Sequence, residues 1–110
     1  MATLTTLTRD LQHAAAHAIQ AAAAVSDNGT CNCDGVFLRL PRHRAAKVLA
    51  IINAAGLAAT KWERHGYYGT GYLISPPGSG QANKRAKAAD AMYERLRNAG
   101  WDVSQYHQCD

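Results

Sequence analysis

A short polar stretch carries the side chains best suited to chemistry in this chain. It reads Thr30, Cys31, Asn32, Cys33 and Asp34. Hydroxyl, amide and carboxylate groups form hydrogen bonds with polar ligands, and thiolates and carboxylates also bind metal ions. A turn alone needs fewer groups of this kind, so we interpret the stretch as the best candidate for a functional site.

This stretch leads directly into the clearest strand pattern of the sequence. Val36, Leu38 and Leu40 alternate with Phe37 and Arg39, which is the period-2 pattern of a half-buried strand. Apolar spacing, glycines and prolines predict six further elements, with Pro41 in the first turn of the second helix. These are helices over residues 5–25, 41–55 and 81–98, and strands over residues 57–64, 67–75 and 101–107.

The order of these elements indicates an α+β protein. A βαββαβ arrangement of this kind is the ferredoxin-like sandwich, an antiparallel sheet in the order 4-1-3-2 with two helices on one face. Residues 29–110 form this domain, and residues 1–28 add an amphipathic helix and a loop to the same compact unit. That helix either covers the open sheet face, packs beside the other helices, or pairs with a second copy. We expect one core that contains Leu38, Val48, Leu49, Ile52, Leu73, Met92 and Leu96.

Three polar segments meet at one end of the predicted sheet, because the first strand begins beside the ends of the third and fourth strands. The third helix also begins there, and its free N–H groups and partial positive charge attract anions. We find no convincing catalytic set, so we expect a binding protein rather than an enzyme. The predicted site, for a nucleotide or a nucleic-acid phosphate, comprises Thr30, Asn32, Asp34, Gln81, Asn83, Lys84, Arg85, Gln108 and Asp110.

The same three segments carry a resemblance to a known group of proteins. The chain reads GTCN-x-D before the first strand, GQ-x-N at the start of the third helix and Q-x-D after the last strand. In these motifs it resembles small uncharacterised proteins of bacteriophages and prophages, over residues 29–110. The resemblance implies a viral protein that acts in the cytoplasm of a bacterial host.

A second resemblance is to RNA-recognition domains, which share the predicted fold. Residues 36–40, VFLRL, are similar to their first-strand motif, with Phe37 at the aromatic position. Residues 68–75 match the third-strand motif in part, whereas Thr70 and Ser75 stand where aromatic rings would stack on bases. This resemblance implies RNA binding, with bases stacked on aromatic side chains of the strands.

The cysteines allow a metal site. This fold brings together four soft ligands, enough for a tetrahedral zinc ion: Cys31, Cys33, His107 and Cys109. The alternative is that the thiols are ordinary buried side chains on adjacent strands. An odd number of cysteines argues against a disulfide framework. His13 and His17 share a helix face, but without a third ligand we interpret them as surface histidines.

The net charge of +4 is unevenly spread. Eleven Lys and Arg face three acidic residues between Val36 and Gly100. A basic body suits a phosphate-bearing or acidic partner, although a basic solvated surface is the commoner cause. No apolar run is long enough to span a membrane, and the first residues do not read as a signal peptide. We therefore expect a cytoplasmic protein with no membrane contact.

Two functions from different classes follow from these patterns. The first is a non-enzymatic protein that binds a nucleotide or a nucleic-acid phosphate at the polar site. The alternative is a phage-encoded inhibitor of a host defence protein, similar to an anti-CRISPR protein, that docks through its basic surface. A zinc-stabilised RNA-binding domain is a third hypothesis. Each is compatible with a homodimer formed through the N-terminal helix or the sheet face.

Overall fold

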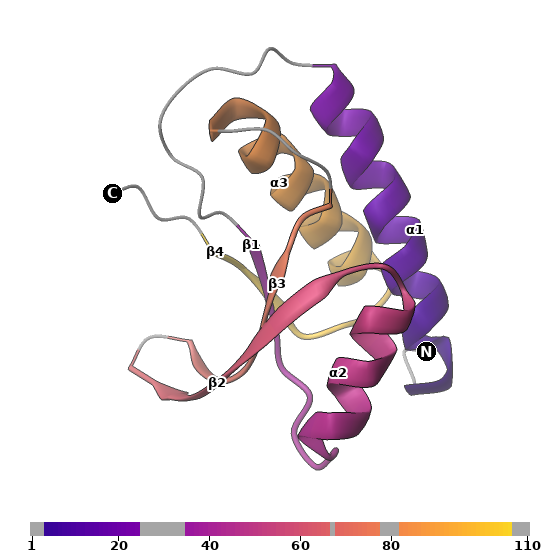
Figure 1. Ribbon diagram of the computed structural model, residues 1–110. Helices are drawn as coiled ribbons and strands as arrows, with labels where there is room; N and C mark the ends of the chain where they lie inside the picture. The colour runs from indigo at the N-terminus through magenta and orange to yellow at the C-terminus, as the bar shows by residue number, and fades with distance from the viewer. Residues whose placement is uncertain (1–3, 25–34, 67, 78–81, 107–110) are drawn as a thin grey trace.

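The computed structural model describes residues 4–24, 35–66, 68–77 and 82–106. Helices and strands follow one another in the predicted order (Figure 1). Each predicted element is present, with its ends shifted by a few residues. The bounds are α1 (Leu4–Ala23), β1 (Gly35–Leu38), α2 (Ala45–Ala54), β2 (Ala58–His65), β3 (Gly69–Ser75), α3 (Ala82–Asn98) and β4 (Val103–Tyr106).

The strands form one antiparallel sheet in the order β2-β3-β1-β4. β1 lies between its two partners, since Leu38 pairs with Tyr72 of β3 and with Val103 of β4. This is the predicted order 4-1-3-2 read from the other edge, so the ferredoxin-like arrangement is confirmed. The start of β1 lies beside the end of β4, where Gly35 pairs with Tyr106.

One face of the sheet packs against all three helices. Val36 and Leu38 of β1 and Tyr72 and Ile74 of β3 point into this layer and are buried. Full burial of a large apolar side chain contributes about 1.5–3 kcal/mol, so this layer dominates the stability of the fold. The largest buried helical side chains are Leu7, Leu11, Val48, Ile52, Met92 and Leu96.

α1 packs beside α3 in the helix layer, which is one of the three positions that the sequence allowed (Figure 1). Two polar contacts fix it there. The indole Nε1 of Trp101 donates a hydrogen bond of 2.9 Å to the carboxylate of Asp10, and Lys84 Nζ donates one of 3.0 Å to the carbonyl oxygen of Ala22. In the described part of the chain, no helix covers the opposite face of the sheet, which we call the open face.

The connection from β1 to α2 differs from the prediction. Pro41 lies in a turn before the helix, and α2 begins only at Ala45. Arg42 turns the chain with a φ of 72°, a left-handed conformation that is uncommon for a residue other than glycine. Arg44 takes the N-cap position without a side-chain hydrogen bond to the helix. The predicted first turn of the helix is therefore a loop.

Two predicted core residues lie elsewhere. Leu73 pairs with Phe37 and points to the open face, because its neighbours Tyr72 and Ile74 occupy the helix side of the strand. Leu49 is half-buried at the edge of the core. Among the described residues, no helix is both long and apolar enough to cross a membrane.

Candidate functional site

Most residues of the predicted polar and zinc sites lie outside the described residues, so their roles stay predictions. The described strand ends do bring the start of β1 beside the end of β4, as the prediction requires. The residues concerned are Thr30, Asn32, Asp34, Gln81, Gln108 and Asp110, the side chain of Asn83, and the predicted zinc ligands Cys31, Cys33, His107 and Cys109.

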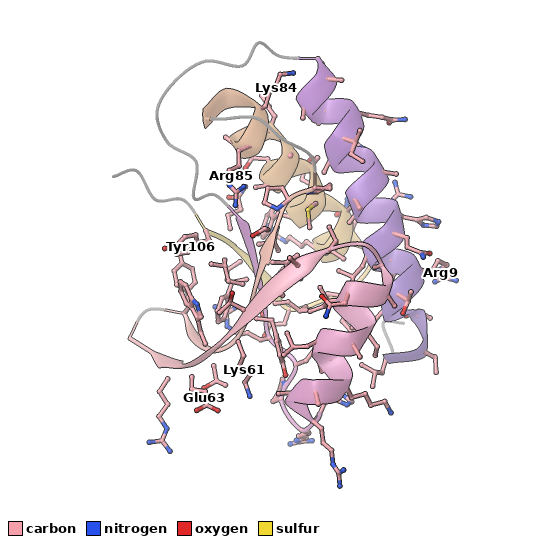
Figure 2. All side chains as sticks on the ribbon, viewed as in Figure 1. Arg9, Lys61, Glu63, Lys84, Arg85 and Tyr106 are labelled. Atoms are coloured by element: carbon pink, nitrogen blue, oxygen red, sulfur yellow. The ribbon has the colours of Figure 1, made fainter. Side chains whose placement is uncertain are left out.

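Lys84 and Arg85 are the members of the predicted site whose side chains the structure describes. Lys84 is bound to the carbonyl oxygen of Ala22 at the end of α1, where helices leave carbonyl groups unpaired. Arg85 lies near the start of β1 (Figure 2), and its buried Nε has no hydrogen-bond partner among the described residues. A buried N–H without a partner is costly. Arg85 therefore favours an anionic group near the start of α3, whereas Lys84 holds two helices together.

The open face carries four aromatic rings that pack on one another. They come from β1, β2, the β2–β3 connection and β4, and we call Phe37, Trp62, Tyr68 and Tyr106 the aromatic cluster. Neighbouring ring centroids lie 5.3–6.4 Å apart, within the usual range for aromatic pairs. Phe37 is fully buried beneath the others, which are half-buried. Tyr106 lies on the side of the sheet away from α1 (Figure 2). The cluster thus covers the sheet and still presents aromatic surface to solvent.

Sequence reasoning identified only Phe37 among these rings. Trp62 pairs with Gly71 across the β2–β3 ladder, and Tyr106 is two residues from Ser104, which pairs with Phe37. Alternate residues of a strand share a face, so the register of the sheet places Trp62 and Tyr106 beside Phe37. The predicted strand order, combined with the alternation of side chains along each strand, would have placed Trp62 and Tyr106 beside Phe37.

Arg39 fixes the cluster at the end of β1. Its Nε donates a hydrogen bond of 3.0 Å to the carbonyl oxygen of Tyr68, and its Nη1 donates one of 2.9 Å to Ser104 Oγ. The same nitrogen lies 3.3 Å from a carboxylate oxygen of Asp102, and the guanidinium lies over the ring of Phe37. Arg39 therefore ties the β2–β3 connection to β4 and holds Tyr68 in the cluster.

The third-strand part of the RNA-recognition motif does not face the open side. Tyr72 is 2% exposed and belongs to the helix-side core. Gly71 and Leu73 take the open-face positions of β3 instead, since Leu73 pairs with Phe37. Of the matched aromatic positions, Phe37 alone reaches the open face. Trp62 and Tyr106 of the neighbouring strands supply aromatic surface in place of β3.

Cations gather where β1 ends and α2 begins. We call Arg42, Arg44, Lys47, Lys61 and Arg64 the basic end. Among the described residues, Lys61 of this group forms an ion pair with Glu63, with 3.7 Å between Nζ and Oε1. α2 has no acidic residue in its first turn and no side-chain cap, so the positive end of its dipole adds to the same potential. Arg39 lies between the basic end and the aromatic cluster.

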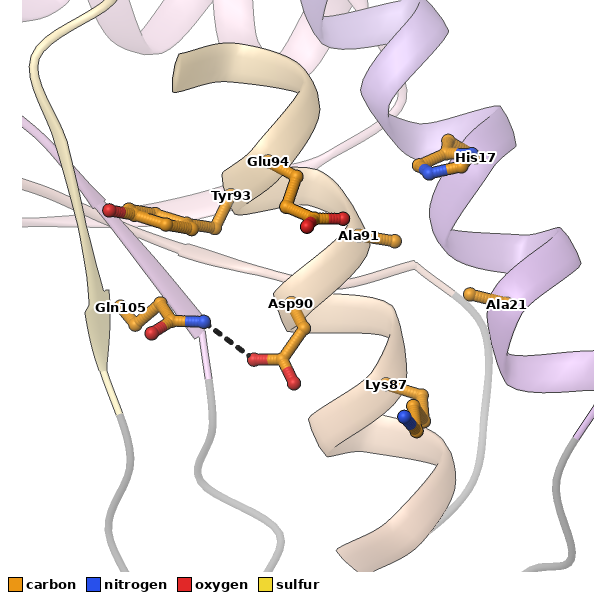
Figure 3. A pocket seen from close by; sticks show the side chains of 8 residues that line it. All are labelled: His17, Ala21, Lys87, Asp90, Ala91, Tyr93, Glu94 and Gln105. Atoms are coloured by element: carbon orange, nitrogen blue, oxygen red, sulfur yellow. Dashed lines mark hydrogen bonds between the residues drawn. The ribbon is translucent and has the colours of Figure 1, made fainter. Parts of the chain in front are cut away.

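A hollow with a volume of about 410 Å³ runs along α3. Figure 3 shows His17 of α1 and Glu94 of α3 pointing toward one another across it. Gln105 of β4 donates a hydrogen bond of 2.8 Å to Asp90, and Lys87 adds a positive charge. The lining mixes both signs of charge, so it does not select one class of ligand.

Within the described ranges, no group of three His, Cys, Asp or Glu side chains is placed to hold a metal ion. The i, i+4 pair His13 and His17 lines a shallow surface hollow with Arg95, where a cation is disfavoured. Comparison with protein-family models, with curated proteins and with solved structures gives no match for this chain. The geometry alone therefore carries the functional argument.

Proposed function

We propose that this protein is a non-enzymatic binding protein for single-stranded nucleic acid, and that bases stack on the open face of the sheet. The observation that carries the proposal is the partly exposed aromatic cluster beside the basic end. Proteins that bind single strands combine these two features, a stacking platform and a cationic path for the phosphates. A double helix hides its base faces, so the platform suits single strands.

The aromatic rings supply the first part of the binding free energy. Trp62, Tyr68 and Tyr106 each keep part of their surface accessible. Stacking of a base on such a ring contributes about 1–3 kcal/mol, whatever the base. Two stacked bases would therefore give measurable affinity with little sequence preference.

The basic end supplies the second part. Arg42, Arg44 and Lys47 are exposed, and Lys or Arg side chains that neutralise phosphates release counterions from the strand. With about three phosphates neutralised, the slope of log Kobs against log salt should be about −2 for a single strand. Arg39, already hydrogen-bonded within the face, positions Tyr68 rather than the phosphates.

A second phosphate contact at the start of α3 is supported by Arg85, whose buried Nε has no partner among the described residues. This is the place that the sequence predicted for a nucleotide or nucleic-acid phosphate. The basic end and the start of α3 lie at opposite ends of β1, so a strand that crosses the aromatic cluster would run from one to the other.

Fluorescence anisotropy tests the proposal with labelled single-stranded DNA and RNA of about ten nucleotides, and a duplex as comparison. Tyr106→Leu keeps apolar volume but removes the ring, and should weaken binding about 5- to 150-fold, as the loss of one stacking contact of about 1–3 kcal/mol predicts. Tyr106→Phe should bind nearly normally. Tyr93→Leu on α3 is the matched control and should not alter binding. Equal affinity for duplex and single strand, or unchanged binding by Tyr106→Leu, would contradict the proposal.

Tryptophan fluorescence gives an independent measurement. Trp62 is in the aromatic cluster, whereas Trp101 is 7% exposed in the helix-side core. A bound strand should quench Trp62, because bases stack against it, and leave Trp101 unchanged. Trp62→Phe should abolish the quenching while keeping an aromatic ring for binding. Quenching that persists in Trp62→Phe would place the strand elsewhere.

A further inference from the structure

A pocket of about 170 Å³ lies at the basic end, between the β1–α2 connection and strands β2 and β3. Leu40 and Pro41 form an apolar wall. Arg42, His43, Lys61 and Thr70 bring polar groups to it from three separate segments. It is therefore a concave site with converging cationic side chains, unlike the mixed lining of the groove along α3.

Lys61 is the half-buried cation of this pocket. Its side chain is 29% exposed, and its Nζ lies 5.7 Å from the centre of the Tyr72 ring, which also lines the pocket. Its partner Glu63 is 75% exposed and 3.7 Å away, longer than the 2.7–2.9 Å typical of a charge-assisted hydrogen bond. The ammonium group has three donors, and this loose pair leaves them available to a stronger acceptor.

The start of α2 follows closely after the pocket residues Arg42 and His43, and it adds positive potential near the pocket. Arg42 and His43 stand directly before α2, and the helix begins without a side-chain cap. Its first N–H groups therefore lack a side-chain acceptor, and they carry the positive end of the helix dipole. Lys61 and Tyr72 line the pocket from the helix side of the sheet. Gly71, which pairs with Trp62 of the aromatic cluster, lines it at the end of β1, where a nucleic-acid strand leaving the open face would pass around the sheet. The pocket thus adjoins the surface on which we place the bases.

We infer that this pocket binds a phosphate group of the nucleic-acid strand, with Lys61 and Arg42 as its principal cationic contacts. The inference rests on the proposed function and names the phosphate site within it. A terminal phosphate and an internal phosphodiester share the chemistry that the pocket recognises. They can be distinguished because only binding of a terminal phosphate makes the affinity depend on whether the end of the strand is phosphorylated.

Inorganic phosphate alone provides the first test. Thermal unfolding is followed in rising phosphate, with chloride adjusted to hold the ionic strength constant. A ligand that binds the folded state raises Tm, so the wild-type protein should gain Tm with phosphate. Lys61→Met, which keeps the chain length over Tyr72 but removes the charge, should lose that gain. Lys87→Met on α3 is the matched control and should keep it.

Oligonucleotides with a 5′-phosphate, a 3′-phosphate or hydroxyl ends provide the second test. For a terminal phosphate, one phosphorylated strand should bind the wild-type protein at least fivefold more tightly, and Lys61→Met should remove that preference. For an internal phosphate, Lys61→Met should lower the affinity for all strands by a similar factor. The slope of log Kobs against log salt should then be smaller in magnitude by about one. Arg42→Gly should show the same pattern and guards against a folding defect in the first variant.

Unchanged affinity in both Lys61→Met and Arg42→Gly, together with no effect of phosphate on Tm, would overturn the inference. This outcome differs from failure of the proposed function. If strands bind through Tyr106 but ignore Lys61, only the phosphate pocket is wrong. If phosphate protects through Lys61 but no strand binds, the pocket stands and nucleic-acid binding is wrong.

Discussion

The ring of Phe37 in β1 lies against Gly71 of β3, with no room for a side chain on Gly71. A Cβ built on Gly71 would lie 2.6 Å from Cε2 of the Phe37 ring and 2.6 Å from the carbonyl oxygen of Leu38. Such separations are shorter than van der Waals contact. The missing side chain of Gly71 therefore makes room for the Phe37 ring, which packs against Trp62 and Tyr68.

Gly71→Ala should destabilise the protein by about 1–3 kcal/mol, the usual cost of overpacking. The added methyl group must displace the Phe37 ring or part β1 from β3. Gly66→Ala is the control, because a Cβ there meets nothing within 4 Å, and it should change stability by less than about 0.5 kcal/mol. Urea denaturation measures both. Equal stability of the two variants would show that the sheet adjusts freely at Gly71.

The hydrogen bond between Trp101 and Asp10 should be a measurable part of the attachment of α1. The Asp10 side chain is 13% exposed, and a hydrogen bond to a charged group contributes about 1.5–3 kcal/mol. Asp10→Ala should lower stability by that amount. A double-mutant cycle with Trp101→Phe removes the packing loss of the indole and isolates the bond. A coupling energy near zero would mean that this hydrogen bond contributes nothing to the attachment of α1.

Leucines of α2 and α3 should differ in the cost of truncation. Leu96 is fully buried, whereas Leu49 is half-buried at the edge of the core. Leu96→Ala should therefore cost about 2–5 kcal/mol, and Leu49→Ala less than half as much. Denaturant melts measure the free energy of unfolding of both variants, and the comparison is direct because each variant replaces leucine with alanine. A larger loss for Leu49→Ala would place α2 deeper in the core than the structure has it.

The fold could be predicted from the sequence because, along most of the chain, the spacing of apolar residues and the positions of glycine and proline indicated the same elements. The apolar stripe of α1 and the left-handed stops at Gly56 and Gly100 were readable, and both glycines have positive φ. The prediction failed where local rules compete. Pro41 suits a first helical turn, but Arg42 in a left-handed conformation delays the helix to Ala45.

The open-face site was harder to read, because it depends on register. Leu73 looks like a core residue by type, and only its pairing with Phe37 shows that it faces the other way. Tyr68 precedes Gly69, whose φ of 84° redirects the chain, so simple alternation does not place its ring with Phe37. Residue types predicted aromatic and basic content, whereas strand pairing decided which rings lie together.

Zinc remains a testable expectation from the sequence. If Cys31, Cys33, His107 and Cys109 hold the ion, purified protein should contain about one zinc per chain by elemental analysis, because four such ligands complete a tetrahedral structural site. A chelator should then lower Tm, since binding of a structural metal contributes directly to folding. Cys33→Ser should lose both the metal and the chelator effect. Metal-free protein with an unchanged Tm would leave the cysteines as packing residues.

Arg42 offers a way to separate stability from binding at one position. Its φ of 72° is disfavoured for residues with a Cβ and natural for glycine, and such a conformation costs about 1–3 kcal/mol. Arg42→Gly relieves that cost and adds flexibility to the unfolded chain, so its net stability should be unchanged or higher by up to about 1 kcal/mol. Arg42→Val, which is β-branched, should be less stable than wild type. Both variants lose the charge and should bind phosphate and single strands more weakly to the same extent. If the two variants change stability in opposite directions but weaken binding equally, the guanidinium of Arg42 serves binding and not the turn. If Arg42→Gly strongly destabilises the protein, the Arg42 side chain holds the turn.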